Sequence, residues 1–399
     1  MHLVRDRAAE YGVIGVDPQK LSFDLAKAVA RKDRVVAWVH KGVYKALDHN
    51  KNITFLRGRA EFSSPVDLRV DGRVITVEKS ILATGSQPTP AKIAGLAEAG
   101  YLTNDGALKL DRLPSSMIVI GAGYEGVEFA QMYARFGTRV TLLGRAPRVM
   151  PQTEPELSDM LGDILRADGV DLHTSAEVVR AGVEDGSRYV MVREAGVERR
   201  YQAELLLVAV GRIARVEGLG LQQAGVEMVG PFVHANSELR TARDNIWSIG
   251  DANGGAMFTH RATYDGPIAA LNAVKSIGRE VDYRVVPWAV FTEPALASVG
   301  LTEAEAKQQG FAVKIGLADF ADSGRAKAMG MTEGRVKLIV AAENDQLLGG
   351  HILGPHADIL IHQVVTAMYP GGTAESIAKS IHVHPTLSEV VKRAARSAR

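Results

Sequence analysis

Cysteine is absent from all 399 residues of the chain. Without a thiol, these residues cannot form a disulfide, a thiolate metal site, a catalytic thiolate or a dithiol redox centre. Long apolar runs are missing as well: Met117–Ile120 and Leu205–Val210 have the length of a strand, not the ~20 residues of a membrane-spanning helix. The first residues contain no apolar segment or cleavage site typical of a secretory signal, so we predict a cytoplasmic protein.

An excess of charge of either sign is also absent, since 47 basic and 46 acidic side chains give a formal net charge of +1. This balance gives no reason to expect nucleic acid or a membrane as a partner. The composition is that of an ordinary globular protein, with 46% hydrophobic and 23% charged residues. The length allows two or three domains, each with its own core. No metal site is predicted.

The N-terminal quarter changes from a helical to an extended pattern. Apolar residues at roughly helical spacing predict one or two helices in the first fifty residues, and residues 53–61 look extended. Asp71-Gly72 lies between two short alternating segments and predicts a hairpin, because both residues tolerate the positive φ of a tight turn. A short apolar strand, Ser80–Ala83, then leads into Thr84-Gly85.

From Ser115 the pattern predicts a βαβ unit of about thirty residues, with strand 117–120, helix 124–136 and strand 139–143. Further strands and helices are expected from apolar runs and amphipathic spacing at 156–167, 177–183, 189–194, 205–210, 246–249, 313–317, 335–340, 347–352, 359–368 and 373–380. The alternation after residue 281 is typical of a separate α+β domain. The fold class is therefore α/β, with Rossmann-type nucleotide-binding domains followed by a C-terminal α+β domain.

A glycine motif follows the first strand of the βαβ unit and opens its helix. Gly121, Gly123 and Gly126 form a G-x-G-x-x-G in which the first glycine permits a tight turn. The second lets the backbone approach a pyrophosphate, and the third lets helix and strand pack closely. The helix N-terminus then offers free N–H groups and a positive dipole to the phosphates. This context predicts a dinucleotide site.

The end of the second strand predicts which dinucleotide binds. A carboxylate there bonds the ribose 2′-hydroxyl of NAD, whereas arginine suits the 2′-phosphate of NADP. The sequence has Gly144 followed by Arg145, with Arg148 three residues on. NADP is therefore the preferred ligand, and NAD remains an alternative because both arginines could be ordinary solvated side chains.

Several motifs in the same order resemble the pyridine nucleotide-disulfide oxidoreductase family, which includes dihydrolipoamide dehydrogenase, glutathione reductase and mercuric reductase. The resemblance covers essentially the whole chain. It is carried by Gly121–Gly126, Ala83-Thr84-Gly85, Val210-Gly211-Arg212, Ser248-Ile249-Gly250-Asp251, Phe291-Thr292-Glu293-Pro294 and His384-Pro385-Thr386-Leu387-Ser388-Glu389. Asp251–Gly255 with Phe258-Thr259-His260 is most similar to the mercuric-reductase-like flavoproteins and those of reactive-chlorine resistance.

The resemblance implies an FAD site in addition to the NADP site. It assigns Gly250-Asp251 to the flavin's ribityl chain, and it points the N-terminus of a helix starting near His260–Ala262 at the isoalloxazine ring. Other cofactor-binding positions that it implies are Thr84 and Gly85 in a crossover strand, Gly211, Tyr124 over the nicotinamide pocket, and Glu128, which in the family pairs with a lysine near the flavin. That lysine lies in a segment not found among these residues.

The C-terminal motif implies catalysis across a homodimer. His384 and Glu389 resemble the dyad that one subunit presents to its partner's active site, where an imidazole held by a carboxylate exchanges a proton with a dithiol. The same resemblance divides the chain into residues 1–113 and 236–286 of an FAD domain, 114–235 of an NAD(P) domain and 287–399 of a dimerisation domain.

Two features depart from the family's pattern. The first G-x-G-x-x-G, which holds the ADP half of FAD, and the Cys-x4-Cys pair that follows it are not found in the printed sequence. We therefore expect an N-terminally truncated FAD- and NADPH-linked oxidoreductase that retains little FAD. Two alternatives stay open: a cysteine-independent diaphorase or transhydrogenase, and a non-catalytic nucleotide-binding dimer. The sequence does not identify the small-molecule electron acceptor.

Overall fold

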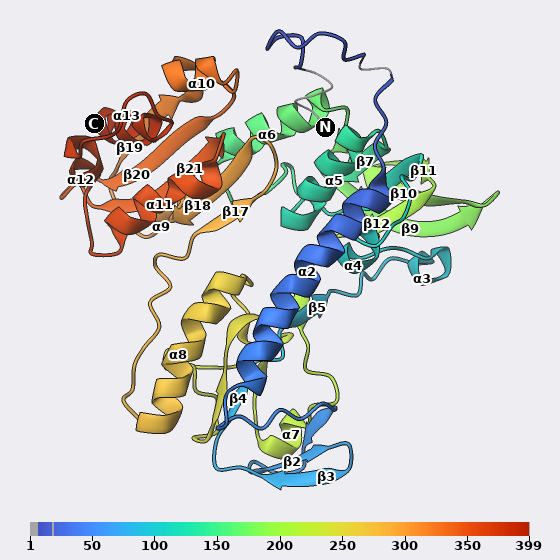
Figure 1. Ribbon diagram of the computed structural model, residues 1–399, viewed down its shortest axis with the longest axis vertical. Helices are drawn as coiled ribbons and strands as arrows, with labels where there is room; N and C mark the ends of the chain where they lie inside the picture. Colours follow the sequence, from blue (N-terminus) through green and yellow to red (C-terminus); the bar gives the residue numbers. More distant parts are fainter. Residues whose placement is uncertain (1–6, 18–19, 399) are drawn as a thin grey trace. The chain divides into compact units, whose positions relative to one another are not determined.

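The computed structural model describes residues 7–17 and 20–398 (Figure 1). The chain forms two compact units, each built from segments that are far apart in the sequence. The first unit contains the residues up to Val29, Pro90–Val210 and the residues from Arg284 onward, and the second contains Ala30–Thr89 and Gly211–Tyr283. None of the helices formed by the described residues is both long and apolar enough to cross a membrane.

A parallel sheet of order β12-β6-β7-β8 lies in the first unit. Its strands are β6 (Ser116–Ile120), β7 (Arg139–Leu143), β8 (Asp171–His173) and β12 (Leu205–Val208). Residues 117–119 of β6 are completely buried, as expected of a central strand covered on both faces. Helix α5 (Tyr124–Phe136) joins β6 to β7. It ends at Gly137, which has a φ of 108°, a value that glycine adopts more easily than other residues. Helix α6 (Pro155–Ala167) leads into β8. The predicted βαβ unit is confirmed.

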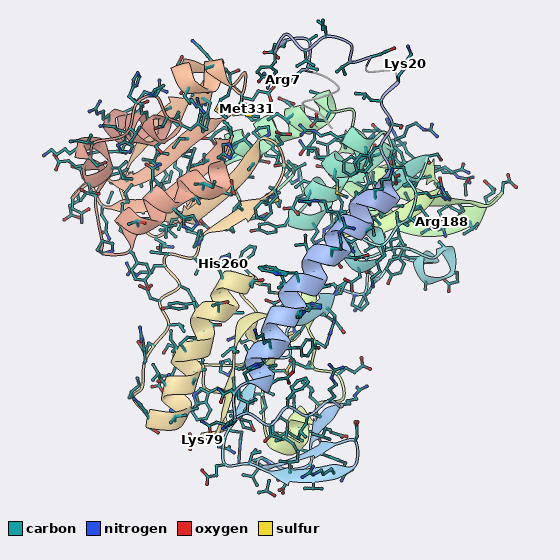
Figure 2. The ribbon with its side chains drawn as sticks, viewed as in Figure 1. Arg7, Lys20, Lys79, Arg188, His260 and Met331 are labelled. Carbon is teal, nitrogen blue, oxygen red and sulfur yellow. The ribbon has the colours of Figure 1, made fainter. Side chains whose placement is uncertain are left out.

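An antiparallel sheet of order β11-β10-β9 follows β8 in the chain. It consists of β9 (Ala176–Glu184), β10 (Ser187–Glu194) and β11 (Val197–Ala203), and short helices α3 (Leu96–Ala99) and α4 (Asn104–Ala107) precede the parallel sheet. Figure 2 labels Arg188 on β10, whose guanidinium donates to the carbonyl oxygens of Ala99 at 3.1 Å and Glu204 at 2.6 Å. These bonds connect the antiparallel sheet to α3 and to the start of β12.

The C-terminal part of the first unit is a five-stranded antiparallel sheet of order β17-β18-β21-β20-β19. Its strands are β17 (Trp288–Val290), β18 (Ala295–Gly300), β19 (Val313–Asp319), β20 (Arg335–Ala341) and β21 (Leu347–Gly354). Helices α11 (Ala357–Met368), α12 (Ala374–Lys379) and α13 (Ser388–Ser397) pack on one face around Val336 and Leu338, and α9 (Glu303–Gln308) packs on the other around Ile339. The short η3 (Phe320–Asp322) and α10 (Gly324–Ala328) link β19 to β20.

The second unit is built from short strands that pair across long sequence distances. Strand β4 (Ser80–Leu82) pairs in parallel with β16 (Ile246–Ser248), and β5 (Ser86–Pro88) pairs antiparallel with β13 (Arg212–Ala214). The unit also holds the meander β1 (Ala60–Phe62), β2 (Asp67–Val70) and β3 (Arg73–Thr76), together with α7 (Leu221–Ala224), β14 (Met228–Val229), β15 (Phe232–Val233), η2 (Gly250–Asn253) and α8 (Thr259–Lys275). Helix α2 (Leu25–Asp48) crosses the division between the units.

The structure differs from the predicted elements where the local sequence shows no clear apolar periodicity. The Asp71-Gly72 turn is confirmed, with φ of 46° and 86°, but of the segment predicted as extended only Ala60 and Glu61 lie in a strand. Strands β11, β17 and β18 and helix α13 were not predicted. The polar residues of β11 are mostly exposed, so this strand has no apolar alternation to reveal it.

Candidate cofactor-binding site

The glycine motif forms the loop between β6 and α5. Gly121 has a φ of 110°, and any side chain there would collide with the carbonyl of Ala209. Gly126 lies directly against the carbonyl of Gly121, so a Cβ is excluded there too. At Gly123, by contrast, a Cβ would meet nothing within 4 Å. This open backbone at the start of α5 is what a pyrophosphate needs in order to approach the helix N-terminus.

The segment after β7 contains the residues for which the sequence predicts a role in nucleotide selection. Gly144 is buried, its N–H donates to the carbonyl of His173 at 2.8 Å, and a Cβ on it would lie 2.8 Å from the Cβ of Ala122. Packing therefore excludes a carboxylate at this position. Arg145 is exposed and forms no hydrogen bond or ion pair within residues 7–17 and 20–398. Arg148 is also exposed, and its Nε lies 2.7 Å from Asp159 on α6.

Tyr124 and Glu128 lie one turn apart on α5. The ring of Tyr124 contacts that of Trp288 edge to face, with centroids 5.1 Å apart, and burial raises the pKa of its hydroxyl. Glu128 accepts a hydrogen bond from the backbone N–H of Phe291 at 2.7 Å. Burial raises the pKa of Glu128, and the hydrogen bond from Phe291 offsets this in part. Trp288 was not among the predicted site residues, although its position before the Phe291-Thr292 motif could have suggested it.

In the second unit, the carboxylate of Asp251 is held by a neighbour that the sequence did not single out. The hydroxyl of Ser86 donates to Oδ2 of Asp251 at 2.6 Å and itself accepts a hydrogen bond from Nε of Arg212 at 2.8 Å. Ser86 follows Thr84-Gly85, and Arg212 follows Gly211, so both predicted motifs converge on the same aspartate. The antiparallel pairing of β5 with β13 brings them together.

The backbone around Asp251 is shaped by glycines and by one unsatisfied hydroxyl. Gly85 and Gly211 have φ of 68° and 105°, which favours glycine in both. The hydroxyl of Thr84 is buried and has no hydrogen-bond partner among the described residues. A buried hydroxyl without a partner is costly. Together with the oriented carboxylate of Asp251, it fits a ligand that offers hydroxyl groups, such as the ribityl chain of FAD.

Helix α8 begins beside this aspartate. His260 lies in its first turn (Figure 2), and its ring stacks on that of Phe258 with centroids 5.3 Å apart. Ala262 packs against Gly250, where a Cβ would lie 2.9 Å from the alanine methyl group. The N–H of Gly250 also donates to buried Asp265 at 3.0 Å. The start of α8 and the Gly250-Asp251 loop therefore hold each other in place.

Two further residues that the sequence did not predict fix the same loop. Arg261 is 5% exposed, and its Nη2 donates to Asn253 at 2.6 Å and to the hydroxyl of Tyr283 at 3.1 Å. Tyr283 in turn donates to Asp265 at 2.7 Å. Burial and the hydrogen bond to Asp265 raise the pKa of Tyr283 to about 12, so its hydroxyl stays protonated at neutral pH.

The two residues predicted to form a dyad are in contact. Nδ1 of His384 lies 3.1 Å from Oε1 of Glu389, which is in the first turn of α13. Glu389 also accepts a hydrogen bond from the backbone N–H of Thr386 at 3.0 Å. This N–H and the imidazole both lower the pKa of Glu389, so the carboxylate is charged at neutral pH. The imidazole is 81% exposed on the chain.

The predicted residues are divided between the two units. The first contains Gly121, Gly123, Tyr124, Gly126, Glu128, Arg145, Arg148, His384 and Glu389, and the second contains Thr84, Gly85, Gly211, Gly250, Asp251, His260 and Ala262. Across residues 7–17 and 20–398, no group of three or more histidine or carboxylate side chains could hold a metal ion.

Comparison with known proteins agrees with this geometry. Residues 12–266 match the family described as pyridine nucleotide-disulphide oxidoreductase, and residues 286–395 match its dimerisation domain. The dihydrolipoyl dehydrogenase of Chlorobaculum tepidum is 37% identical over 400 residues, covering 98% of this chain and 85% of the relative. The mercuric reductase of Staphylococcus aureus is 34% identical over 373 residues, covering 93% and 68%. The structure of the HOCl-induced flavoprotein disulfide reductase RclA from Escherichia coli has a TM-score of 0.87 and 31% identity, covering 96% of this chain and 87% of that one. The chain therefore belongs to the pyridine nucleotide-disulphide oxidoreductase family.

Proposed function

We propose that the chain is an NADPH-linked flavoprotein oxidoreductase that passes reducing equivalents through FAD to a small-molecule acceptor. The observation that carries the proposal is the open glycine loop at Gly123, followed after β7 by the exposed guanidinium of Arg145. The loop offers backbone N–H groups to a pyrophosphate, and the arginine offers a positive charge where NAD-selective relatives need a carboxylate.

The residues of the second unit fit FAD. When bound, FAD supplies the ring that accepts hydride from the nicotinamide and releases electrons to the acceptor. Asp251, fixed by Ser86, accepts a hydrogen bond from a ligand hydroxyl, and Thr84 finds there the partner that it lacks. The N-terminus of α8 offers a positive dipole end to negative charge on a bound ligand.

His384 and Glu389 supply proton transfer. The hydrogen bond from the imidazole helps to lower the pKa of Glu389, and the charged carboxylate, 3.1 Å away, holds the ring in one orientation. The exposed imidazole is presented away from its own chain, which supports the proposal that it acts in a homodimer. Its substrate there is a dithiol, or an acceptor that takes up a proton with the electrons.

A second candidate is a diaphorase or transhydrogenase that passes electrons from the flavin directly to a quinone or dye. The absence of cysteine from the 399 residues favours it, because no thiolate of this chain can relay electrons. Reduction of a dye but not of a disulfide by this chain with NADPH and FAD would favour the second candidate over the first.

The proposal is tested by titrating the purified chain with NADPH in a calorimeter and with FAD by visible absorbance. NADPH and FAD should both bind, and NADPH should then support dye reduction. Asp251→Asn should weaken FAD binding, whereas Asp244→Asn, at an aspartate with a 96% exposed side chain in the same unit, should not. Failure of both nucleotides to bind the folded chain would refute the proposal.

A further inference from the structure

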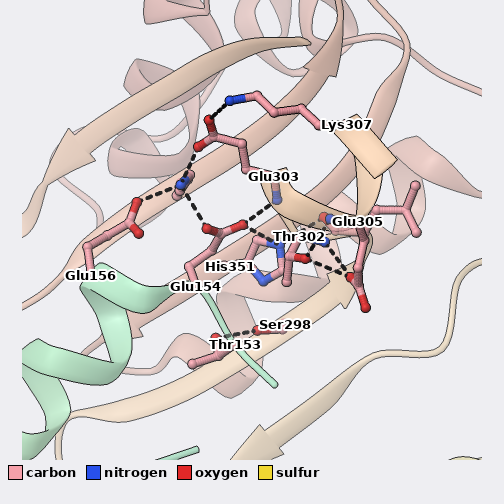
Figure 3. A network of polar contacts seen from close by, with 11 residues as sticks. Thr153, Glu154, Glu156, Ser298, Thr302, Glu303, Glu305, Lys307 and His351 are labelled. Carbon is pink, nitrogen blue, oxygen red and sulfur yellow. Dashed lines mark hydrogen bonds and ion pairs between the residues drawn. The ribbon is translucent and has the colours of Figure 1, made fainter. Parts of the chain in front are cut away.

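A buried network of charged side chains joins the first turn of α6 to the C-terminal sheet (Figure 3). Lys337 on β20 is 3% exposed, and its Nζ lies 2.8 Å from Glu154, 2.6 Å from Glu156 and 2.8 Å from Glu303. Glu154, at the N-cap of α6, is 1% exposed, and its other oxygen accepts a hydrogen bond from the backbone N–H of Glu303 at 2.6 Å. One lysine thus binds the beginnings of α6 and α9 to one strand.

Lys337 supplies the positive charge that Glu154 needs in this buried position. Burial lowers the pKa of Lys337, but hydrogen bonds to the three glutamates raise it further than burial lowers it, so the amine stays charged. His351 is a second base beside this carboxylate, with Nε2 3.8 Å from Glu154. Burial lowers the pKa of His351, so it stays neutral and adds no second positive charge. Removal of the lysine would leave a buried carboxylate uncompensated.

The same turn of α6 holds the segment that leads back to the glycine loop. The N–H of Ser158 donates to the carbonyl of Glu154 at 3.0 Å, and the hydroxyl of Ser158, 1% exposed, donates to the carbonyl of Val149. The next residue, Met150, donates its N–H to the carbonyl of Ala122 at 2.9 Å. Ala122 lies between the first two glycines of the motif. Ion pairs, hydrogen bonds and the peptide bond between Val149 and Met150 therefore connect β20 to the dinucleotide loop without a gap.

A second contact connects α6 to Arg148, one of the two arginines predicted to bind the 2′-phosphate. Asp159, next to Ser158 on α6, lies 2.7 Å from Nε of Arg148. Rotation or displacement of the first turn of α6 would move Arg148 and the loop backbone together. Apolar packing of Leu157 and Leu161 in one core cluster with Leu353 also holds α6 against the C-terminal sheet. This packing resists separation but does not define the rotation of the helix as a directional ion pair does.

We propose that Lys337 of the C-terminal sheet is a positioning residue for the NADPH site, acting through Glu154 and the first turn of α6. The inference rests on the proposed function, because it takes NADPH as the ligand of the glycine loop. Lys337 does not touch that loop. Instead, Lys337 fixes the start of α6. From there Ser158 bonds to Val149, and Asp159 bonds to Arg148.

The experiment measures the NADPH and NADH dissociation constants of the folded chain by calorimetry, together with the Tm of each variant. Lys337→Met should weaken NADPH binding by about fivefold or more, and NADH binding by less, because Arg148 serves the 2′-phosphate. Arg335→Met is the matched control. It removes another cation of β20, whose Nε lies 2.6 Å from Asp319 on β19. The NADPH and NADH dissociation constants of this variant should stay within about twofold of those of the unaltered chain.

Lys337→Met could fail to fold, so two further variants decide the proposal. Lys337→Met/Glu154→Gln removes the buried charges together, which proteins often tolerate; it should regain much of the lost Tm but bind NADPH as weakly as the single variant. Ser158→Ala removes one hydrogen bond and no charge, and it should weaken NADPH binding by about threefold. NADPH binding at the unaltered affinity in both variants would overturn the inference. Failure of the unaltered chain to bind NADPH would instead refute the proposed function.

Discussion

Ser86 and Asp251 are 165 residues apart in the chain, yet the serine hydroxyl donates to the aspartate at 2.6 Å. Arg212 donates to the same hydroxyl, so the serine passes the orienting effect of the guanidinium on to the carboxylate. This relay leaves the other oxygen of Asp251 for a ligand. The serine is therefore a positioning residue for the aspartate that the family resemblance assigns to the flavin.

Ser86→Ala should lower the free energy of unfolding by about 2 kcal/mol, because Ser86 is only 8% exposed and its hydrogen bond to the charged carboxylate is lost. Thr76→Val is the control, since Thr76 donates to Asp67 at the same distance, 2.6 Å, on the exposed surface. It should cost less than about 0.5 kcal/mol. Chemical denaturation measures both, and equal effects would contradict the relay.

Arg145→Glu should reverse the nucleotide preference. The substitution replaces the exposed cation that we propose for the 2′-phosphate by a carboxylate, which repels a phosphate and suits the 2′-hydroxyl of NADH. We expect NADPH to bind at least about tenfold more weakly and NADH to bind no worse, measured by calorimetry. Arg139→Glu changes the same charge at the opposite end of β7 and should leave the preference intact. An unchanged preference in Arg145→Glu would rule out NADP selection by this residue.

Glu128 should make stability fall as the pH rises. Its folded pKa is raised by burial, so the folded state favours the protonated carboxyl. Glu128 therefore stabilises the folded state fully below the pKa of its carboxyl in the unfolded chain, about 4.3. This contribution is lost as the pH rises through the higher pKa of the folded state. Glu128→Gln keeps an acceptor for the N–H of Phe291 and never ionises. Its Tm should exceed that of the unaltered chain at pH 8, and the difference should vanish near pH 4; a constant difference across this range would contradict the assignment.

The chain should form a homodimer through its C-terminal part. Ile381 is 100% exposed and Val383 75% exposed, beside the His384 dyad, and Ile359 on α11 is 63% exposed. Exposed large apolar side chains of this kind are typical of an interface. Sedimentation velocity should show a dimer that Ile381→Glu/Val383→Glu dissociates. Val197→Glu, at a 58% exposed valine at the start of β11, should remain dimeric.

The polypeptide of residues 1–399 should hold FAD weakly. It contains one G-x-G-x-x-G, which we propose binds NADPH, so the ADP half of FAD lacks a comparable phosphate loop in these residues. We expect FAD to bind in titration but to remain below one equivalent after gel filtration, measured by visible absorbance. Retention of one equivalent would show that Asp251 and its neighbours are sufficient by themselves.

Local elements of this chain could be predicted from sequence, whereas pairings across long distances could not. The βαβ unit from Ser116 to Leu143 is defined by contiguous apolar strands, a glycine loop and a glycine stop, all within one stretch. Strand β18 has the sequence Ala-Leu-Ala-Ser-Val-Gly, whose small residues give little strand signal although most of them are buried.

The site residues, too, could be predicted where the signal is local and not where it depends on distant partners. The glycines of the dinucleotide loop follow from a motif with one physical meaning, and His384 with Glu389 follows from the resemblance of the C-terminal motif to the family. Ser86 and Lys337 carry no signal of their own, because their roles depend on partners 165 and 183 residues away. A lysine in a strand is usually a solvated side chain, and nothing in the sequence near Lys337 indicates that it is 3% exposed.

The division of the second unit into two distant segments also sets the order in which it can form during synthesis. Strand β4 is made long before β16, the strand with which it pairs through Ser80 and Ile246. At ~5–20 residues per second, the ribosome needs roughly ten to thirty seconds to make the residues between them. Pro90–Val210, which contains the whole parallel sheet, emerges in that interval and can fold first. β4 therefore spends this time without its partner strand, and we expect ribosome-bound chains ending before Ile246 to be cleaved by protease in Ser80–Pro88 but not in β6 or α5.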